Sequence, residues 1–600
     1  MPFGAESRPG GTVRFGLWAP GARTVALELS GAGPPRAMPR LDGGWFELET
    51  EARPGDRYRF RIDGKHPVPD PASRFQPQGV DGESEVVEPA DFDWRDAAWR
   101  GRSWKEAIIY ELHVGTFTPA GTYRGAEEKL DYLAALGVTA IELMPVSSFP
   151  GRRNWGYDGV LPFAPAAVYG RPEDLKHFIQ AAHAKNLMVF LDVVHNHFGP
   201  EGNYLGLYAP CFFTERHRTP WGQAINFDGP DSRTVRDFFI HNALYWLKEY
   251  HFDGLRFDAV HAIRDDSRPD ILTELAETVR GQLSAEREIH LVLENDSNGA
   301  RYLARNRGGR PLWYTAQWAD DLHHALHVLL TGETGGYYAD YAGEPAWHLG
   351  RSLAEGFSYQ GEPSEFRQGA RRGEPSRELP PECFVSFLQN HDQVGNRALG
   401  ERMVELADGQ AVRLAMEILL LAPYPVLLFM GEEFGAATPF HFFCDFQPEL
   451  GAKVREGRRA EFARSMPLAS PEEQSRIPDP TSEQAFLDSR LDWSSVGRDP
   501  HRAWLSLYQR LLSNRCRKIV PLIQDIRPGG GSFELLGPRG LQVRWPLGAE
   551  GSLELIANFG PNPVALASRP EGELISTSAA GLGAASKEMP PLSAAWFLKA

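Results

Sequence analysis

Four short stretches of the chain end in polar residues of the kinds that do chemistry. They are Asp192-Val193-Val194-His195-Asn196-His197, Arg256-Phe257-Asp258-Ala259-Val260-His261, Glu294-Asn295-Asp296 and Gln389-Asn390-His391-Asp392-Gln393. Each follows an apolar run that suits a buried strand, where an unpaired charge costs several kcal/mol. The cost falls away where a strand ends at a cleft and its charges are paired. We therefore predict a site at which Asp258, Glu294 and Asp392 converge.

Converging carboxylates without a phosphate-binding loop suit the hydrolysis of glycosidic bonds. One carboxylate attacks the anomeric carbon and another group protonates the leaving oxygen, at a separation of about 5 to 5.5 Å in retaining enzymes. Arg256 favours the ionised form of Asp258, which makes Asp258 the candidate nucleophile. Glu294 stands among other acids, and like charges raise the pKa of a proton donor. Asp392 would stabilise the cationic transition state.

Each stretch also has a simpler explanation when it is taken alone. Two histidines and an aspartate can bind zinc, but His195 and His197 lack the helical HExxH spacing. Asp258 could form a structural ion pair with Arg256, Glu294 could be a solvated loop residue, and His391-Asp392 could cap a helix. Four such coincidences at one face are improbable. We predict a catalytic site without a cofactor or a required metal.

The elements that would position these residues alternate between strand and helix. Eight strand candidates cover residues 108–114, 140–146, 188–194, 254–260, 289–295, 313–318, 384–390 and 425–431. Helical stretches between them, such as 127–137 and 236–250, predict a parallel sheet, and eight such units fit a (β/α)8 barrel. An open, doubly wound sheet is the alternative, but no GxGxxG or GxxxxGK[ST] follows a strand. In a barrel the active site lies at the carboxyl ends of the strands.

The pattern predicts three domains. Residues 1–98 show short alternating strands typical of a β-sandwich. Residues 99–520 hold the predicted TIM barrel, interrupted by long loops at about 198–233 and 333–380. Residues 521–600 return to β-like runs and predict a small C-terminal β domain. A chain of 600 residues exceeds what one core supports, which agrees with several domains.

Composition and net charge narrow the classes of partner that we expect for this protein. The formal net charge of -16 repels nucleic acid and anionic lipid at long range, so neutral partners are expected. No apolar run reaches the roughly 18 to 20 residues of a membrane span. The N-terminus lacks the features of a secretory signal, and the 4 cysteines form no CxxC pair. These features predict a cytoplasmic protein.

In order and spacing, the four polar stretches resemble the signature regions of the α-amylase superfamily over about residues 105–440. The resemblance implies a (β/α)8 domain that hydrolyses α-glucosidic bonds with retention, using Asp258 as nucleophile, Glu294 as acid/base and Asp392 as stabiliser. It further implies that the following residues bind the sugar or support those that do: Tyr157, Asp158, Asp192, His195, Arg256, His261, His391 and Gln393. Amylases often carry a lysine near Val260, and the first interruption lacks an acidic calcium cage, so no required metal is expected.

Further stretches narrow the resemblance within the superfamily. Residues 15–29 and 58–64 are similar to the β-sandwich of branching enzymes, isoamylases and trehalose-releasing hydrolases. Residues 68–89, 317–338 and 430–462 resemble the maltooligosyltrehalose trehalohydrolases. This implies cleavage of the α-1,4 bond next to the terminal trehalose unit of maltooligosyltrehalose, with water as acceptor. A glycogen branching enzyme, a debranching enzyme and a catalytically dead glucan-binding scaffold are the alternatives.

The trehalose side of such a site would be shaped by loops. The candidates are Trp221 in the first interruption, Trp318, Asp320, Asp321, His323 and His324 after the sixth strand, and Glu432 with Glu433 after the eighth. Trp221 could equally be a core residue. Glu432 and Glu433 could simply favour a helix N-terminus.

Overall fold

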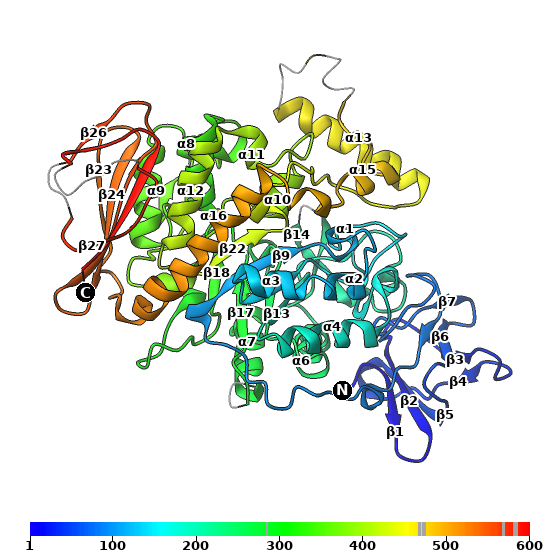
Figure 1. Cartoon of the computed structure of the whole chain (residues 1–600). Helices are drawn as coiled ribbons and strands as arrows, with labels where there is room; N and C mark the ends of the chain where they lie inside the picture. Colours follow the sequence, from blue (N-terminus) through cyan, green and yellow to red (C-terminus); the bar gives the residue numbers. More distant parts are fainter. Residues whose placement is uncertain are drawn as a thin grey trace.

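The computed structural model describes residues 1–219, 221–283, 286–465, 470, 476–566, 570–579 and 586–599. A small all-β block at the N-terminus, a central barrel with helices around it and a second all-β block at the C-terminus follow one another along the chain (Figure 1). Pro220 of the first interruption and residues 567–569, 580–585 and 600 of the predicted C-terminal domain lie outside the described residues. The three-block architecture is confirmed, whereas the boundaries at 98 and 520 stay a prediction.

Eight parallel strands form the barrel. They are β9 (Ile108–Leu112), β10 (Ala140–Leu143), β13 (Met188–Val193), β16 (Gly254–Phe257), β17 (His290–Leu293), β18 (Ala316–Trp318), β21 (Phe384–Val385) and β22 (Val426–Phe429). They pair in the order β21-β18-β17-β16-β13-β10-β9-β22, and a parallel bridge between Ser386 and Val426 closes the ring. All eight strand candidates are confirmed, although β21 is shorter than its apolar run.

Strand register brings the charged residues into one layer. Arg256 on β16 lies opposite Asp192 on β13 and opposite Val292 on β17. The strands approach closely at Gly254, where a Cβ atom would lie 2.4 Å from the carbonyl oxygen of His290. Glycine is therefore required at the start of β16.

Amphipathic helices cover the barrel, and their apolar residues face the strands. They include α2 (Tyr123–Glu127), α3 (Leu130–Leu136), α4 (Pro172–Ala184), α6 (Ser232–Glu249), α7 (Ile271–Leu283), α8 (Asp320–Thr331), α12 (Gly409–Leu421) and α16 (His501–Asn514). The helix predicted over 236–250 is α6, which buries Phe238, Phe239 and Trp246. A further helix, α13 (Pro448–Ser465), follows the last barrel strand and projects at the upper right of Figure 1.

Both interruptions contain regular structure. The first holds α5 (Leu205–Tyr208) and a hairpin of β14 (Phe213–Thr219) and β15 (Gly222–Ile225). The second holds a 3₁₀ helix, η8 (Gly336–Tyr341), then α9 (Pro345–Glu355) and a short ladder of β19 (Glu362–Pro363) with β20 (Arg371–Arg372). The first follows β13 directly and so stands on the face where the strands carry their polar ends. The second lies between α8 and β21, and its Tyr341, Ser358 and Tyr359 donate hydrogen bonds to Asp321 just beyond β18.

The terminal blocks are antiparallel. At the N-terminus, β1 (Gly4–Arg8), β2 (Thr12–Trp18) and β5 (Trp45–Glu51) form one sheet, and β3 (Val25–Leu29), β4 (Arg36–Ala37), β6 (Arg57–Ile62), β7 (His66–Val68) and β8 (Ser84–Glu85) form another. The rings of Phe15 and Tyr58 meet between the two sheets at 4.8 Å. At the C-terminus, β23 (Ser532–Leu535), β24 (Gly540–Leu547), β25 (Gly551–Asn558), β29 (Ser593–Lys599) and β27 (Glu573–Thr577) form one sheet. The Trp545 indole on β24 donates to the Leu353 carbonyl of α9 at 2.9 Å.

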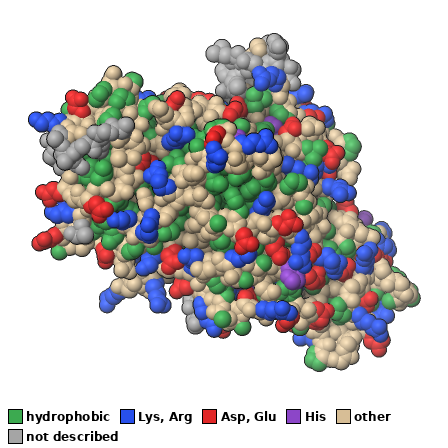
Figure 2. All heavy atoms as spheres, viewed as in Figure 1, with side chains coloured by type: hydrophobic (Ala, Val, Ile, Leu, Met, Phe, Trp, Pro, Cys, Tyr) green, Lys and Arg blue, Asp and Glu red, His purple; other side chains and the backbone are tan. Residues whose placement is uncertain are grey.

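Among the described residues, no helix is both long and apolar enough to span a membrane. On the face drawn in Figure 2, acidic and basic side chains are interspersed, and neither sign forms a continuous patch.

Candidate active site

Arg256 is the centre of the polar group at the barrel end. Its side chain is fully buried, and one terminal nitrogen donates to Asp192 Oδ2 at 2.7 Å and to Asp258 Oδ1 at 2.9 Å. The other terminal nitrogen donates to Glu294 Oε2 at 2.6 Å. The Trp318 ring packs 4.1 Å from the guanidinium carbon. The charge of Arg256 in strand β16 is thus paired, and one guanidinium holds the carboxylates of Asp258 and Glu294 beside each other.

Backbone geometry at the end of β16 fixes the two carboxylates further. Ala259 adopts a left-handed conformation with φ 39° and ψ 47°, and its N–H donates to Glu294 Oε2 at 2.8 Å. Asn196 donates from Nδ2 to Asp258 Oδ2 at 3.0 Å. A non-glycine residue with positive φ carries strain, which is typical of functional sites. The side chains of Asp258 and Glu294 remain 11% and 15% exposed, so both open toward solvent.

His391 links the third carboxylate to this group. Its Nδ1 lies 2.5 Å from Glu111 Oε1, and its Nε2 lies 2.8 Å from the Tyr157 hydroxyl and 3.5 Å from Asp392 Oδ1. The Tyr157 hydroxyl donates to Asp192 Oδ2 at 2.6 Å, so His391 donates to Tyr157 in turn. Burial opposes a charged ring, but Asp392 and Glu111 together raise the pKa of His391 to about 9. His391 is therefore an imidazolium at neutral pH.

The pKa of Glu294, the candidate acid, differs from that of an ordinary surface glutamate. Burial, with the charge of Asp258 added, raises the pKa of Glu294, although Arg256 acts in the opposite direction. The expected direction is confirmed, but burial rather than like charge is the larger cause. Burial likewise raises the pKa of Asp392. A carboxyl with a raised pKa beside a paired carboxylate has the properties of a general acid.

Comparisons with known proteins agree with this architecture. The chain matches the catalytic domain of alpha amylase over residues 81–208. It matches carbohydrate-binding module 48, the isoamylase N-terminal domain, over residues 2–78. Residues 528–596 match a domain of unknown function, DUF3459.

Whole-chain relatives are more specific. The malto-oligosyltrehalose trehalohydrolase of Rhizobium sp. (strain M-11) is 39% identical over 608 residues, which cover 99% of each chain. That of Deinococcus radiodurans is 45% identical over 526 residues, or 87% of this chain and 84% of the relative. The chain belongs to the malto-oligosyltrehalose trehalohydrolase family. Its members are glycoside hydrolases of the α-amylase type.

A solved structure and a partial match to another enzyme show how much of the chain each family accounts for. A Salmonella typhimurium crystal structure named for alpha amylase is 44% identical with a TM-score of 0.94, and the match covers 100% of this chain and 99% of that chain. The Bordetella pertussis 1,4-alpha-glucan branching enzyme is 38% identical over 284 residues, which cover only 43% of this chain and 39% of the relative. The trehalohydrolase family therefore accounts for the whole chain, and the branching enzyme accounts for less than half of it.

Of the residues nominated from the sequence, seven form the linked group described above: Tyr157, Asp192, Arg256, Asp258, Glu294, His391 and Asp392. Three more lie at its border. His261 accepts from the Asp296 N–H at 3.4 Å, Asp158 accepts from Asn154 at 2.7 Å, and Asp320 is half-buried after β18. These placements agree with strand ends that meet at one barrel face.

Trp221 proves to be a surface residue. Its side chain is 50% exposed at the turn of the β14–β15 hairpin, and its ring stacks on His197 at 4.7 Å. His197 donates to the Tyr157 carbonyl at 3.0 Å, which brings the hairpin beside the linked group. The core alternative for Trp221 is wrong, because the hairpin holds it away from the barrel interior.

Several nominated residues are closed to a substrate in this structure. Asp321 is fully buried and accepts from Asn298, Tyr341 and the backbone N–H groups of Ser358 and Tyr359. Trp318 is 1% exposed beneath Arg256. His323 is buried between the Leu388 carbonyl and the Tyr338 hydroxyl, and the buried His324 packs on the rings of Tyr337, Tyr338 and Tyr341. These four residues hold the loops that border the cleft.

Three others lie outside the linked group. His195 is buried with Nε2 at 2.9 Å from Asn242 Oδ1 of α6, and its ring packs on Phe239 and Phe257. Gln393 accepts from the Asn390 N–H at 3.1 Å, which is a capping contact. Glu432 is buried and accepts from the Tyr508 hydroxyl of α16, and burial raises the pKa of Glu432 to about 8. His195 and Glu432 are therefore buried in contacts with α6 and α16, and the half-buried Gln393 is engaged in capping its own helix.

Sequence reasoning missed three supports of the site. Asn196 and His197 stand beside the nominated His195, and they donate hydrogen bonds to Asp258 and to the Tyr157 carbonyl of the linked group. Glu111 was passed over although a charge inside the strand-like run YELHV was a visible signal. It holds both the backbone N–H and Nδ1 of His391.

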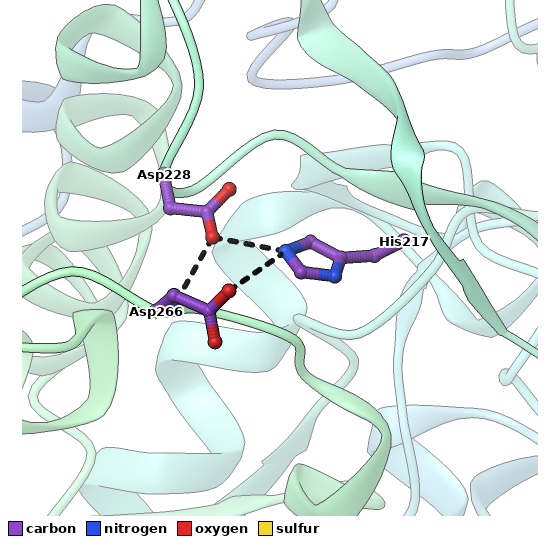
Figure 3. A group of neighbouring side chains, drawn as sticks. All are labelled: His217, Asp228 and Asp266. Atoms are coloured by element: carbon purple, nitrogen blue, oxygen red, sulfur yellow. Dashed lines mark hydrogen bonds and ion pairs between the residues drawn. The ribbon is translucent and has the colours of Figure 1, made fainter.

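One group of side chains among the described residues is spaced closely enough to hold a metal ion. It consists of His217, Asp228 and Asp266, drawn in Figure 3. His217 Nε2 lies 2.9 Å from Asp228 Oδ2, and Arg216 pairs with Asp228 at 3.3 Å and with Asp266 at 2.8 Å. Arg216 already balances the two carboxylates, so the cluster ties the β14–β15 hairpin to the loop before α7. None of its residues was nominated from the sequence.

Proposed function

We propose that this protein hydrolyses the α-1,4-glucosidic bond next to the terminal trehalose unit of maltooligosyltrehalose and releases trehalose and a shortened maltooligosaccharide. Its place in the trehalohydrolase family supports this reaction. The observation that carries the proposal is the pairing of Asp258 and Glu294 with the two terminal nitrogens of Arg256. Its partners are neutral α-glucans and water.

The first half of the reaction forms a covalent intermediate. Asp258 attacks the anomeric carbon while Glu294 transfers its proton to the glycosidic oxygen, which leaves as a trehalose hydroxyl. Arg256 orients Asp258 through a hydrogen bond, and the Ala259 N–H holds the Glu294 carboxyl in line. The bond to the leaving oxygen breaks as the bond to Asp258 forms.

The second half returns both carboxylates to their starting state. Glu294, now ionised, takes a proton from water, and the hydroxide oxygen attacks the same anomeric carbon and releases Asp258. Two inversions give net retention of configuration. Asp392 would stabilise the oxocarbenium-like transition states, with His391 and Tyr157 placed to hold the ring at the cleaved bond.

The leaving side would hold a bent, non-reducing disaccharide. Two exposed rings lie near Asp320, since Tyr337 and Phe366 are 38% and 51% exposed, their ring centroids are 6.3 Å apart, and the charge of Asp320 acts on the Tyr337 hydroxyl. Trp221, 50% exposed on the hairpin after β13, is kept as a further candidate. We keep Asp158, His261 and Asp320 as further sugar contacts. Four free cysteines, Cys211, Cys383, Cys444 and Cys516, suit a reducing cytoplasm, which we propose as its location.

A branching enzyme, which passes the glycosyl group to a sugar hydroxyl, is the second candidate because of its partial match. Incubation with a defined maltooligosyltrehalose separates the two activities. Free trehalose is expected, and new α-1,6 linkages without trehalose would contradict the proposal. Debranching activity would appear instead as hydrolysis of pullulan.

The same assay tests the roles of the residues. Glu294→Gln should lower kcat by about 10²- to 10⁴-fold, the usual contribution of a positioned general acid, while substrate binding survives. The amide keeps the size of the side chain and cannot transfer a proton. Turnover at the level of the parent enzyme would refute the assignment of Glu294, and Asp258→Ala with unchanged hydrolysis would favour a binding scaffold.

A further inference from the structure

Two glutamates on neighbouring barrel strands have opposite surroundings. Glu111 on β9 and Glu142 on β10 lie opposite each other in register, and each is 1% exposed. One oxygen of Glu111 accepts the His391 backbone N–H at 3.0 Å, and the other lies 2.5 Å from His391 Nδ1. Among the described residues, neither oxygen of Glu142 has a hydrogen-bond partner. These two equally buried acids therefore differ in their contact with His391.

The hydrogen bonds of His391 require a proton on both ring nitrogens. An ionised carboxylate can only accept, so Nδ1 donates to Glu111. Nε2 lies 2.8 Å from the Tyr157 hydroxyl, which gives its own proton to Asp192, so Nε2 donates as well. Asp392 Oδ1 lies 3.5 Å from Nε2. The ring thus has a carboxylate near each of its nitrogens, and this arrangement favours the imidazolium over the neutral ring.

His391 is the charge partner of Glu111. Among the described residues, no lysine or arginine forms an ion pair with Glu111. Arg256 opposes a charge on the ring, whereas Asp392 favours it. Without Glu111, Asp392 would have to offset both burial and Arg256. The other titratable or charged groups that act on the ring from the surrounding elements are Tyr157, Asp392, Arg256, Glu142 and His113.

Glu142 does not take the place of Glu111. Burial, followed by the charges of Glu111 and Asp192, raises the pKa of Glu142 well above its ordinary value. Glu142 is therefore neutral at the pH at which Glu111 accepts its two hydrogen bonds. It adds no negative charge that would favour a proton on His391.

Glu111 also anchors the helix that carries His391 and Asp392, which is α10 (His391–Gly395). The first N–H groups of a helix have no partner inside it. The Asn390 side chain accepts from the N–H groups of Asp392 and Gln393, and Glu111 accepts from that of His391. One buried side chain of β9 therefore sets both the start of α10 and the orientation of the His391 ring.

We propose that Glu111 is a positioning residue for the hydrolysis, whose carboxylate keeps His391 doubly protonated and directs its Nε2–H at Tyr157 and at the sugar ring bound there. The inference rests on the proposed function and deepens it. Glu111 acts through His391, because its own side chain is buried beneath the cleft. Glu142, at the same level of the next strand, has no such role.

The test measures the affinity for maltooligosyltrehalose by isothermal titration between pH 5 and pH 9. Every protein carries Glu294→Gln, so the acid cannot titrate and the substrate is not consumed. With Glu111 retained, the affinity should hold to about pH 8, because the pKa of His391 is raised to about 9. With Glu111→Gln added, the ring should lose its proton at lower pH. The affinity should then fall about 10- to 100-fold between pH 5 and pH 8, the range for losing a hydrogen bond to a charged group.

Two further variants separate charge from packing. Glu142→Gln is the matched control, since it changes an equally buried acid that is already neutral, and it should keep the midpoint pH of binding. Glu111→Asp keeps the charge on a shorter side chain, so it should weaken binding at every pH but move the midpoint less than Glu111→Gln does. An equal loss at every pH in Glu111→Gln would show a purely structural role and overturn the inference. The same shift of midpoint in Glu142→Gln would also overturn it.

Nuclear magnetic resonance of the enzyme labelled with ¹⁵N-histidine needs no change at Glu111, so it serves even if the Glu111 variants do not fold. The His391 signals are assigned by their loss in His391→Gln. At pH 8 both ring nitrogens should carry a proton, and a ring with one protonated nitrogen would overturn the inference. A parent enzyme that releases no trehalose from maltooligosyltrehalose overturns the proposed function instead, and the resonance experiment then still tests whether Glu111 holds a charged His391.

Discussion

Replacement of Arg256 by methionine tests the three ion pairs at the centre of the site. Methionine fills similar space without charge, and it leaves Asp192, Asp258 and Glu294 without their shared donor. All three bonds join a fully buried guanidinium to carboxylates that are 15% exposed or less. In such surroundings the charges cannot be replaced by water without opening the barrel end.

The size of the effect follows from those contacts. Removing one partner of a buried ion pair costs about 3 to 5 kcal/mol, because the other charge stays buried. If the transition state bears the same loss, kcat/KM falls by about 10²- to 10³-fold or more. Arg256 also lowers the pKa of Glu294, so its loss raises that pKa, and the acid stays protonated to higher pH. The alkaline limb of the plot of kcat/KM against pH should therefore move to higher pH.

The assay is trehalose release from maltooligosyltrehalose across pH, together with the thermal midpoint. Arg515→Met is the matched control, since Arg515 is equally buried but donates to the carbonyl oxygens of Leu420 and Ala422. The control should lose thermal stability and keep the parent pH profile. Our reasoning fails if Arg256→Met retains near-parental kcat/KM, or if its alkaline limb moves to lower pH.

Two further predictions concern stability. Burial opposes the charge of His183, but its hydrogen bonds to Asp253 and Asp96 raise the pKa of His183. The protonated ring therefore stabilises the folded state fully below the unfolded pKa of about 6.5. This stabilisation is lost as the pH rises through the folded pKa. His183→Gln should thus lower the thermal midpoint most at pH 5 to 6, and a deficit that grows toward alkaline pH would contradict this. Asp321→Ala removes one of the two carboxylate partners of the buried Arg372 and leaves two buried N–H groups unpaired, so it should cost about 3 to 5 kcal/mol of unfolding free energy in urea. A loss below about 1 kcal/mol would count against its structural role.

Much of the barrel and its reactive centre could be predicted from local patterns. Apolar runs of strand length separated by helical periods are enough to propose eight parallel strands, since each strand must be covered on both faces. Charges at the ends of those runs then have to meet, because parallel strands present their carboxyl ends at one rim. Arg256, Asp258 and Glu294 were found in this way, and the family resemblance implied the same catalytic roles that residue chemistry had suggested for Asp258 and Glu294.

Only the tertiary structure decided which way individual loop residues point. Asp320 and Asp321 are adjacent and chemically identical, yet the 333–380 interruption folds over one and leaves the other open. His195 and Asn196 are also adjacent but have different partners: His195 bonds to Asn242 of α6, and Asn196 bonds to Asp258. Side-chain direction after a strand depends on φ and ψ in the turn and on distant segments that pack there, and neither is encoded in residue type or spacing.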